Sequence, residues 1–514
     1  MSHTLHDGAH PRWLEVLPGV LSWGALLGLL VLSLTSPILA ANVLIVYALF
    51  WLSRALLMSA RLIVGYIRYR RDIKRDWAGE LLTHFPYDRV QSIYHMAIVA
   101  VSKEDPSIAL STVQAIADTD YPNDRIIVVL ATERRFRANG QAVARLLKQT
   151  FGRTFAALIH TVHPENIPGE LAGKGSNITW AAQHARSWLD DQQIPYDRVI
   201  CTTLDSDNRV HRKYFSALTY LYLDHPDPAH ASFQPIPMFF NNIWEVPMPI
   251  RSVSLGSSFW QLIESTRPYR LRNFSAHAQS FAGLVQTEYW STRTIVEDGH
   301  QYWRSYFRFN GRHDVVALSV PVYMDAVLSP NGYWDTFREQ YLQKRRWAWG
   351  ASDIPYVLHH TWRNPRLPRF QKWVQAARLI EGHFSWATTS LILALYSWLP
   401  IVVSGELGTA VIAFTFPPLY GRILTSALIG MGVTLTISML LLPPRPKRRA
   451  VQSTGSVILE WLTAPFLLPI SNILLSSIPA LDAQTRLMAG RYLGYRVTEK
   501  HPVRQDLSYH PAAN

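Results

Sequence analysis

The sequence predicts an α/β domain, with a mostly parallel sheet, inserted between two groups of membrane-spanning helices. Three observations support this prediction. Long apolar runs lie near both ends of the 514-residue chain, and the sequence between them is of mixed composition. In that middle part, strand-like and helix-like patterns alternate, which is typical of parallel strands covered by helices. One strand-like run, residues 199–204, ends in two carboxylates, Asp205 and Asp207.

The composition narrows the class of protein. A chain of 514 residues is too long for one ordinary core, so two or more modules are expected. The formal net charge is +13. Because much of the Lys and Arg flanks apolar runs, a membrane surface accounts for this charge more simply than nucleic acid does. The single cysteine, Cys201, excludes an intrachain disulfide and a zinc site built from a cysteine cluster.

The N-terminal part is predicted to be a short cytoplasmic tail, residues 1–16, and a transmembrane hairpin, residues 17–67. No basic segment precedes the first apolar run and a second run follows it, which disfavours a cleaved signal peptide. A dense basic segment, residues 68–75, comes next. The positive-inside rule places this segment, and the domain after it, in the cytoplasm.

The middle domain is predicted to span residues 68–363. Strands and helices are expected to alternate along its first half, with strands at 92–101, 125–130, 155–162 and 199–204 and helices at 106–117, 141–149 and 173–189. The third helix opens with Gly173-Lys174-Gly175-Ser176-Asn177, whose backbone N–H groups and lysine suit an anion. Further on, we expect helices at 281–290 and 340–349 and a strand at 317–323.

The C-terminal part is predicted to return to the membrane. Residues 364–384 are expected to form an amphipathic helix on the membrane face, followed by a transmembrane region, residues 385–480. Two spans are expected, at 385–403 and 423–442. The run 456–480 is interrupted by prolines and could be either a re-entrant segment or a further span. A basic cytosolic tail, residues 481–514, ends the chain.

Four motifs, in this order, resemble those of membrane-embedded family-2 glycosyltransferases of the cellulose-synthase and hyaluronan-synthase type. They are Ala100-Val-Ser-Lys-Glu104, Asp205-Ser-Asp207, Glu297-Asp298 and Gln343-Lys-Arg-Arg-Trp347. The resemblance covers nearly the whole chain. It implies a cytosolic GT-A domain, Rossmann-like with a mostly parallel sheet, between N- and C-terminal transmembrane helices of the inner (plasma) membrane.

The resemblance implies a site for a nucleotide-sugar donor. The leaving diphosphate must be neutralised, and a divalent cation, Mn²⁺ or Mg²⁺, held by Asp205 and Asp207 would do this. The residues expected to contact the donor and its diphosphate are Lys103, Glu104, Glu133, Lys174, Asp205, Gln343 and Arg346. Either His300 or His313 could complete the metal shell, or both could simply pack in the interior.

The resemblance also implies an acceptor site. Asp298 is expected to be the general base that removes the proton of the acceptor hydroxyl, with Glu297 beside it. Trp347 offers a flat apolar platform for the acceptor sugar. Direct attack by the acceptor predicts inversion at the anomeric carbon. Two positions depart from the family pattern: Val296 stands where the family has threonine, and Glu133 with Arg134 and Arg135 follows the second strand.

The predicted function is inverting, metal-dependent transfer of a sugar, with a UDP-sugar favoured as donor, to a growing polysaccharide that could be coupled to passage across the membrane. An alternative is the addition of a single sugar to a lipid or lipid-linked acceptor. A transporter or scaffold with a degenerate nucleotide-binding domain is a third alternative, and the intact carboxylates argue against it. Donor, acceptor and membrane lipids are the expected partners, and nucleic acid is not.

Overall fold

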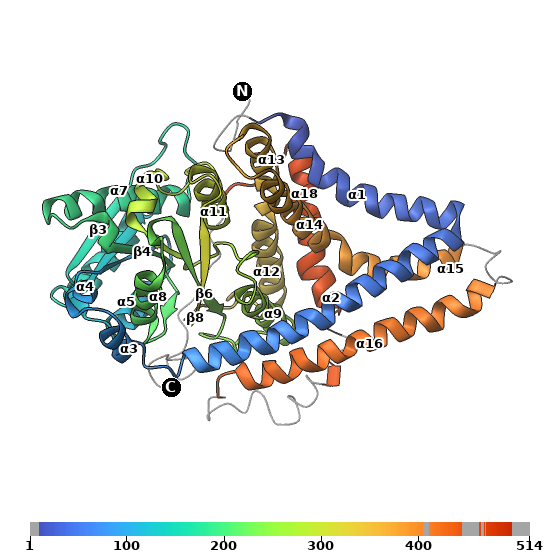
Figure 1. Cartoon of the computed structure of the whole chain (residues 1–514), viewed down its shortest axis with the longest axis horizontal. Coiled ribbons are helices and arrows are strands. Elements are labelled where there is room, and N and C mark those ends of the chain that lie inside the picture. Colours follow the sequence, from blue (N-terminus) through green and yellow to red (C-terminus); the bar gives the residue numbers. More distant parts are fainter. Residues whose placement is uncertain (1–9, 404–410, 445–461, 464–466, 468, 496–514) are drawn as a thin grey trace.

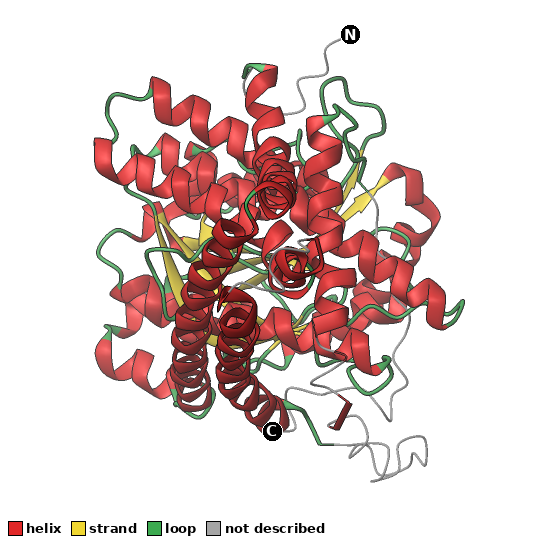
Figure 2. Ribbon diagram, turned by 90° about the vertical axis from the view of Figure 1, so that its right-hand side faces the viewer, coloured by secondary structure: helices red, strands yellow, loops and turns green. Residues whose placement is uncertain are grey.

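The computed structural model describes residues 10–403, 411–444, 462–463, 467 and 469–495. An α/β domain forms one side of the molecule, and long helices from both ends of the chain form the other (Figure 1). Viewed from the side of the long helices, helices lie in front of the strands (Figure 2). Parts of the expected N-terminal tail, of the run 456–480 and of the basic tail lie outside the described residues.

The α/β domain is built on one eight-stranded sheet in the order β3-β2-β1-β4-β7-β6-β8-β5. The strands are β1 Tyr94–Ala100, β2 Ile126–Glu133, β3 Ala157–His163, β4 Val199–Asp205, β5 Arg209–Val210, β6 Ala231–Met238, β7 Ala278–Ser280 and β8 Asp314–Tyr323. The first four strands in the sheet order run parallel, whereas β7 pairs antiparallel with both β4 and β6. The predicted α/β class with a mostly parallel sheet is confirmed.

Helices cover both faces of this sheet. Those of the α/β domain are α3 Trp77–His84, α4 Tyr87–Gln91, α5 Pro106–Ala117, α6 Arg137–Phe151, α7 Lys174–Asp191, α8 Tyr214–Asp224, α9 Met248–Ser265, α10 Phe281–Gln286, α11 Glu297–Arg308, α12 Tyr333–Ala348 and α13 Asp353–Arg363. Alternate residues of β1 enter different cores: Ala97 and Val99 pack with α5 and α8, whereas Met96 and Ile98 pack with α7 and α10. A strand buried on both faces reads as a continuous apolar run, as the sequence shows here.

Local signals explain several helix boundaries. Asp105 caps α5, because its carboxylate accepts a hydrogen bond from the backbone N–H of Ser107 at 2.9 Å, and Pro106 occupies the first helical turn. This helix begins and ends where the sequence predicted. Helix α10 is shorter than the expected 281–290, because Glu288 and Tyr289 have positive φ values of 57° and 61°.

The helices on the other side of the molecule, called the long helices below, are α1 Arg12–Thr35, α2 Pro37–Asp72, α14 Arg369–Ala394, α16 Val411–Leu441 and α18 Ile478–Met488, together with the short α15 Leu399–Val403. Among the described residues, α1, α2 and the part of α16 from Phe416 to Leu441 are long and apolar enough to cross a membrane. Helix α14 and the following helical segment meet at 46° and make a fourth candidate if they form one bent span. These helices are compatible with membrane association, as the sequence predicted.

Helix α14 differs from the expected boundary between an interfacial helix and a span. Residues 369–394 form one uninterrupted helix, so the amphipathic segment runs directly into the apolar one. No proline occurs between Arg369 and Ala394, and the single glycine, Gly382, has no atom within 4 Å of its Cβ position. The sequence therefore offers no break at residue 384, and the bend occurs only after Ala394.

Candidate active site

A cavity of about 1110 Å³ lies where the sheet meets the long helices. Its lining at the sheet end includes Glu104, Lys174, Asp205, Asp207, Glu297 and Asp298. It continues between α9, α12, α14 and α16, where hydroxyl and amide side chains contribute to its wall: Thr389, Ser390, Thr434, Ser438 and Asn472. One continuous space therefore joins charged residues at the strand ends to polar residues of the long helices.

Asp205 and Asp207 sit at the carboxyl end of β4, which lies in the interior of the sheet between β1 and β7. The Asp205 side chain is one-third exposed and accepts a hydrogen bond from the Ser275 hydroxyl at 3.2 Å. Asp207 is buried and accepts one from the backbone N–H of Asp325 at 3.0 Å. Asp205 is thus open to a ligand, whereas Asp207 is fixed by the loop after β8.

Lys174 is the cation at the centre of the site. It opens α7, and its buried ammonium lies 3.1 Å from Asp205, 3.2 Å from Asp298 and 3.6 Å from Glu297. Burial pulls the pKa of Lys174 down, but the three carboxylates outweigh it and leave the pKa well above its ordinary value. The ammonium is therefore charged and links α7 to β4 and α11.

Glu297 and Asp298 lie side by side in the first turn of α11 but differ in their proton affinity. Burial, and after it the neighbouring Asp298 charge, raise the pKa of Glu297 to about 7. Burial also acts on Asp298, but Lys174 and a hydrogen bond from His277 outweigh it and lower its pKa. At neutral pH Asp298 is an ionised acceptor, while Glu297 is poised near its titration point.

His277 is a site residue that the sequence analysis did not single out. Its Nε2 accepts a hydrogen bond from the indole N–H of Trp290 at 3.1 Å, which leaves the ring proton of the neutral imidazole on Nδ1. Nδ1 lies 3.0 Å from the Phe274 carbonyl oxygen and 3.4 Å from the Asp298 carboxylate. His277 precedes the three-residue strand β7, which has too short a pattern to be recognised in the sequence.

The residues expected at the nucleotide end are only partly brought together. Glu104 is buried in the cavity wall and accepts a hydrogen bond from the backbone N–H of Ser102 at 2.7 Å. Glu133 also lines the cavity, and its carboxylate pairs with Arg135 at 2.8 Å. Lys103 is exposed and does not line the cavity. Lys103 is therefore the one expected donor residue that lies away from the site.

Helix α12 presents the Gln343-to-Trp347 motif to the cavity. Gln343, Arg346 and Trp347 all contribute to its wall, because residues three and four positions apart share one face of a helix. The Arg346 guanidinium lies 5.6 Å from the ring centre of Tyr495. Trp347 packs with Phe239 at 6.1 Å between ring centres. The motif thus forms part of the cavity wall.

Asp205 and Asp207 fit a hard divalent cation in the chemistry of their donor atoms. Two carboxylates with one residue between them, both in the cavity wall, match the way Mg²⁺ is bound by one or two carboxylates together with substrate phosphates. Within the described residues no group of three His, Cys, Asp or Glu side chains is arranged to hold a metal. His300 bonds to Asp353 at 2.8 Å and His313 to Ser232 at 3.0 Å, so both are engaged elsewhere.

Comparisons with known proteins give remote matches. No family model and no curated protein matches the sequence. Among solved structures, a mannosyltransferase from Pyrobaculum calidifontis in complex with GDP-Man and Mn²⁺ is 14% identical, with 86% of this chain and 97% of that chain covered and a TM-score of 0.42. S. aureus TarS 1-349 in complex with UDP-GlcNAc is also 14% identical, with coverages of 79% and 93% and a TM-score of 0.36. Because the identities and TM-scores are this low, these matches do not identify the function of this chain, and its function has to be inferred from the site.

Proposed function

We propose that this protein is a membrane-associated, inverting glycosyltransferase that moves a sugar from a nucleoside diphosphate to an acceptor hydroxyl. The observation that carries the proposal is the position of Lys174, which lies between Asp205 on one side and Glu297 and Asp298 on the other, at the strand ends. The carboxyl ends of strands are where open α/β sheets bind their ligands. The site therefore combines cationic groups for a leaving diphosphate with a carboxylate for proton removal.

The donor half of the reaction uses the cationic side chains of the site. As the glycosidic bond breaks, negative charge grows on the diphosphate, and Lys174 and Arg346 lie in the cavity wall to balance it. Asp205 and Asp207 would hold a Mn²⁺ or Mg²⁺ ion, which supplies further charge neutralisation when bound. Glu104 and Glu133 are the groups of the cavity wall that we assign to the nucleotide.

The acceptor half of the reaction uses Asp298. Its carboxylate takes the proton of the acceptor hydroxyl as that oxygen attacks the anomeric carbon from the side opposite the diphosphate, and the configuration inverts. Lys174 keeps the pKa of Asp298 low. A diphosphate beside Lys174 would compete for the same ammonium and raise the pKa of Asp298 toward the working pH. Glu297 then orients the acceptor, which rests on Trp347.

A long acceptor is supported by the helical end of the cavity. Its wall carries hydroxyl and amide groups, such as Thr434 and Asn472, which can form hydrogen bonds with a sugar chain, beside apolar groups such as Leu435. We therefore favour a growing polysaccharide that leaves between the long helices. The second candidate is transfer of one sugar to a lipid-linked acceptor, which is favoured by the exposed apolar side chains of α1 and α2.

The proposed function is tested by measuring sugar transfer by the purified protein. Radiolabelled UDP- and GDP-sugars are supplied in turn with Mn²⁺ or Mg²⁺, and the products are sized by gel filtration and lipid extraction. A ladder or an excluded peak supports a polysaccharide, and one labelled sugar in the lipid phase supports the second candidate. Absence of transfer and of nucleotide release from every donor would contradict an enzyme and favour a transporter or scaffold.

A further inference from the structure

Two buried lysines line the cavity, and only one of them is neutralised by the protein. Lys174 lies among three carboxylates, as described above. Lys344, on α12, is 7% exposed, and in the described part of the chain no carboxylate lies within ion-pairing distance of its ammonium. Burying a charged amine without a counter-ion is costly, so an unneutralised lysine in a ligand cavity calls for an explanation.

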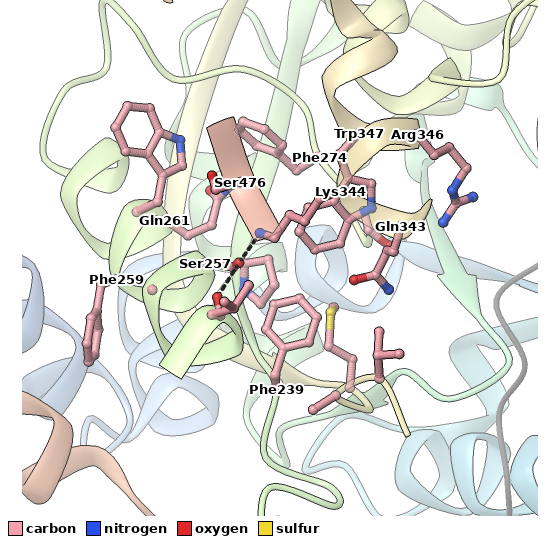
Figure 3. Close-up of a pocket in the computed structure, with 18 of the residues that line it drawn as sticks. Phe239, Ser257, Phe259, Gln261, Phe274, Gln343, Lys344, Arg346, Trp347 and Ser476 are labelled. Carbon is pink, nitrogen blue, oxygen red and sulfur yellow. Dashed lines mark hydrogen bonds between the residues drawn. The ribbon is translucent and has the colours of Figure 1, made fainter. Parts of the chain in front are cut away.

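The contacts of Lys344 are to neutral groups. Its Nζ donates a hydrogen bond to the Ser257 hydroxyl of α9 at 2.8 Å and lies 4.3 Å from the ring centre of Trp347. Figure 3 shows the Lys344 side chain reaching from α12 toward Ser257 of α9, with Trp347 beside it. An ammonium has three donors, and Ser257 takes one of them. Among the described residues, no second group accepts a hydrogen bond from this ammonium.

The surroundings of Lys344 provide no compensating negative charge in the described part of the chain. Burial lowers the pKa of Lys344 to about 7, and no neighbouring charge contributes to this shift. Two other charged side chains of the cavity wall are engaged: Glu264 pairs with Arg267, and Arg251 donates to the Ile243 carbonyl at 3.1 Å. A methionine would fill the same space between α9 and α12 without the desolvation cost.

We propose that Lys344 is the anion-binding group of the acceptor subsite, and that the acceptor or growing product carries an acidic group, a carboxylate or a phosphate, which lies against Trp347. This rests on the proposed function in one respect, the assignment of this end of the cavity to the acceptor. An oxyanion beside Lys344 would complete its hydrogen bonds and its charge. A neutral glucan would leave the ammonium unpaired.

The experiment measures binding with two matched pairs of probes. The first pair is a β-1,4-linked tetramer of glucuronate and its carboxyl-reduced form, cellotetraose; the second pair is farnesyl phosphate and farnesol. Affinities are measured by calorimetry on full-length protein in nanodiscs of zwitterionic lipid. The wild type is expected to bind the acidic member of one pair about tenfold or more tightly than its neutral partner, which corresponds to one charge-assisted hydrogen bond. The pair that shows the preference identifies a sugar carboxylate or a lipid phosphate as the source.

Variants assign the preference to one residue. Lys344→Met and Lys344→Gln both remove the charge, and Gln keeps a donor for Ser257, so the test does not depend on one variant folding. Both are expected to bind the acidic and neutral probes equally, whereas Lys148→Met, at an exposed lysine of α6, keeps the preference. No preference in the wild type for either pair, or a preference that persists in both Lys344 variants, overturns the inference.

Donor binding in the same samples separates this inference from the proposed function. Retained nucleotide-sugar binding and transfer without any acid preference would overturn the role of Lys344 alone. An acid preference that depends on Lys344, in a protein that transfers no sugar, would overturn the proposed function and leave an anion site.

Discussion

At the scale of single residues, the site is a set of opposed charges in a buried setting. Lys174 is shared by Asp205, Glu297 and Asp298, which come from β4 and α11. In the proposed reaction, sharing one cation between the two halves of the site is expected to couple donor binding to the proton affinity of Asp298. Because these groups are close together, changing one of them is expected to alter the others.

His277 is expected to position Asp298. His277→Leu should lower the turnover number about tenfold to a hundredfold with little change in the donor KM, because a buried carboxylate loses one hydrogen bond. His277→Asn places an N–H near the position of Nδ1 and should recover most of the rate. Steady-state kinetics on both variants checks this. Equal losses in the two variants would indicate a packing role instead.

Glu297 is expected to make stability depend on pH. Burial, and then the Asp298 charge, raise its pKa from 4.5 to about 7, so the folded protein binds a proton that the unfolded chain has released. The resulting stabilisation is complete below about pH 4.5 and is lost as the pH rises through about 7. The melting temperature of the wild type should therefore fall across this interval relative to Glu297→Gln. Parallel curves for the two proteins would contradict the raised pKa.

At the scale of elements, two helix starts and one helix face form the site. The first turn of α7 holds Lys174, the first turn of α11 holds Glu297 and Asp298, and one face of α12 carries Gln343, Arg346 and Trp347. Helix starts suit such a site because their backbone N–H groups stabilise negative charge. The close approach of α7 to α11 depends on a residue without a side chain.

Gly175→Ala is expected to disturb this approach. A Cβ at Gly175 would lie 2.5 Å from the Ser291 carbonyl oxygen and 3.2 Å from the Glu297 Cβ, so α7 or the segment that leads from Ser291 into α11 must shift. Overpacking of this kind lowers the free energy of unfolding by about 1–3 kcal/mol. The rate of sugar transfer should fall more than the affinity for the donor. The matched control is Gly24→Ala on α1, where nothing lies within 4 Å of the added carbon. Wild-type activity in Gly175→Ala would contradict the packing argument.

The sequence predicted those elements whose signals are local. The start of α5 follows from Asp105 and Pro106, and the strand before Asp205 follows from its unbroken apolar run. His277 was not predicted, because it acts through Trp290 and Asp298, which are 13 and 21 residues further along the chain. The continuity of α14 was missed because an amphipathic and an apolar segment can share one helix without a local signal.

At the scale of the whole molecule, the α/β domain and the long helices enclose one cavity. The helices of residues 12–72 and 411–441 come from opposite ends of the chain, yet α2 and α16 lie side by side (Figure 1). The sequence predicted apolar helices on both sides of the domain. Which of their faces lines the cavity depends on packing between segments hundreds of residues apart, and no local pattern specifies it.

Thr434→Trp tests the helical end of the cavity. Thr434 of α16 lines it, so an indole there should shorten the product while donor binding and release of nucleotide remain near wild type. Thr436→Trp is the matched control, because Thr436 is exposed on the same helix and does not line the cavity. Gel filtration of labelled product measures the lengths. Products of equal length in both variants would mean that the acceptor leaves by another route.

The most direct test of sugar transfer by this site is a comparison of Asp298→Asn with the wild type. Nucleotide-sugar binding and label transfer are measured on the same purified samples with Mn²⁺ or Mg²⁺. We predict cation-dependent transfer by the wild type, and in Asp298→Asn a rate about 10²- to 10⁴-fold lower with donor binding retained, as expected for loss of a general base. Transfer by the variant at the wild-type rate, or donor binding lost together with transfer, would contradict the account.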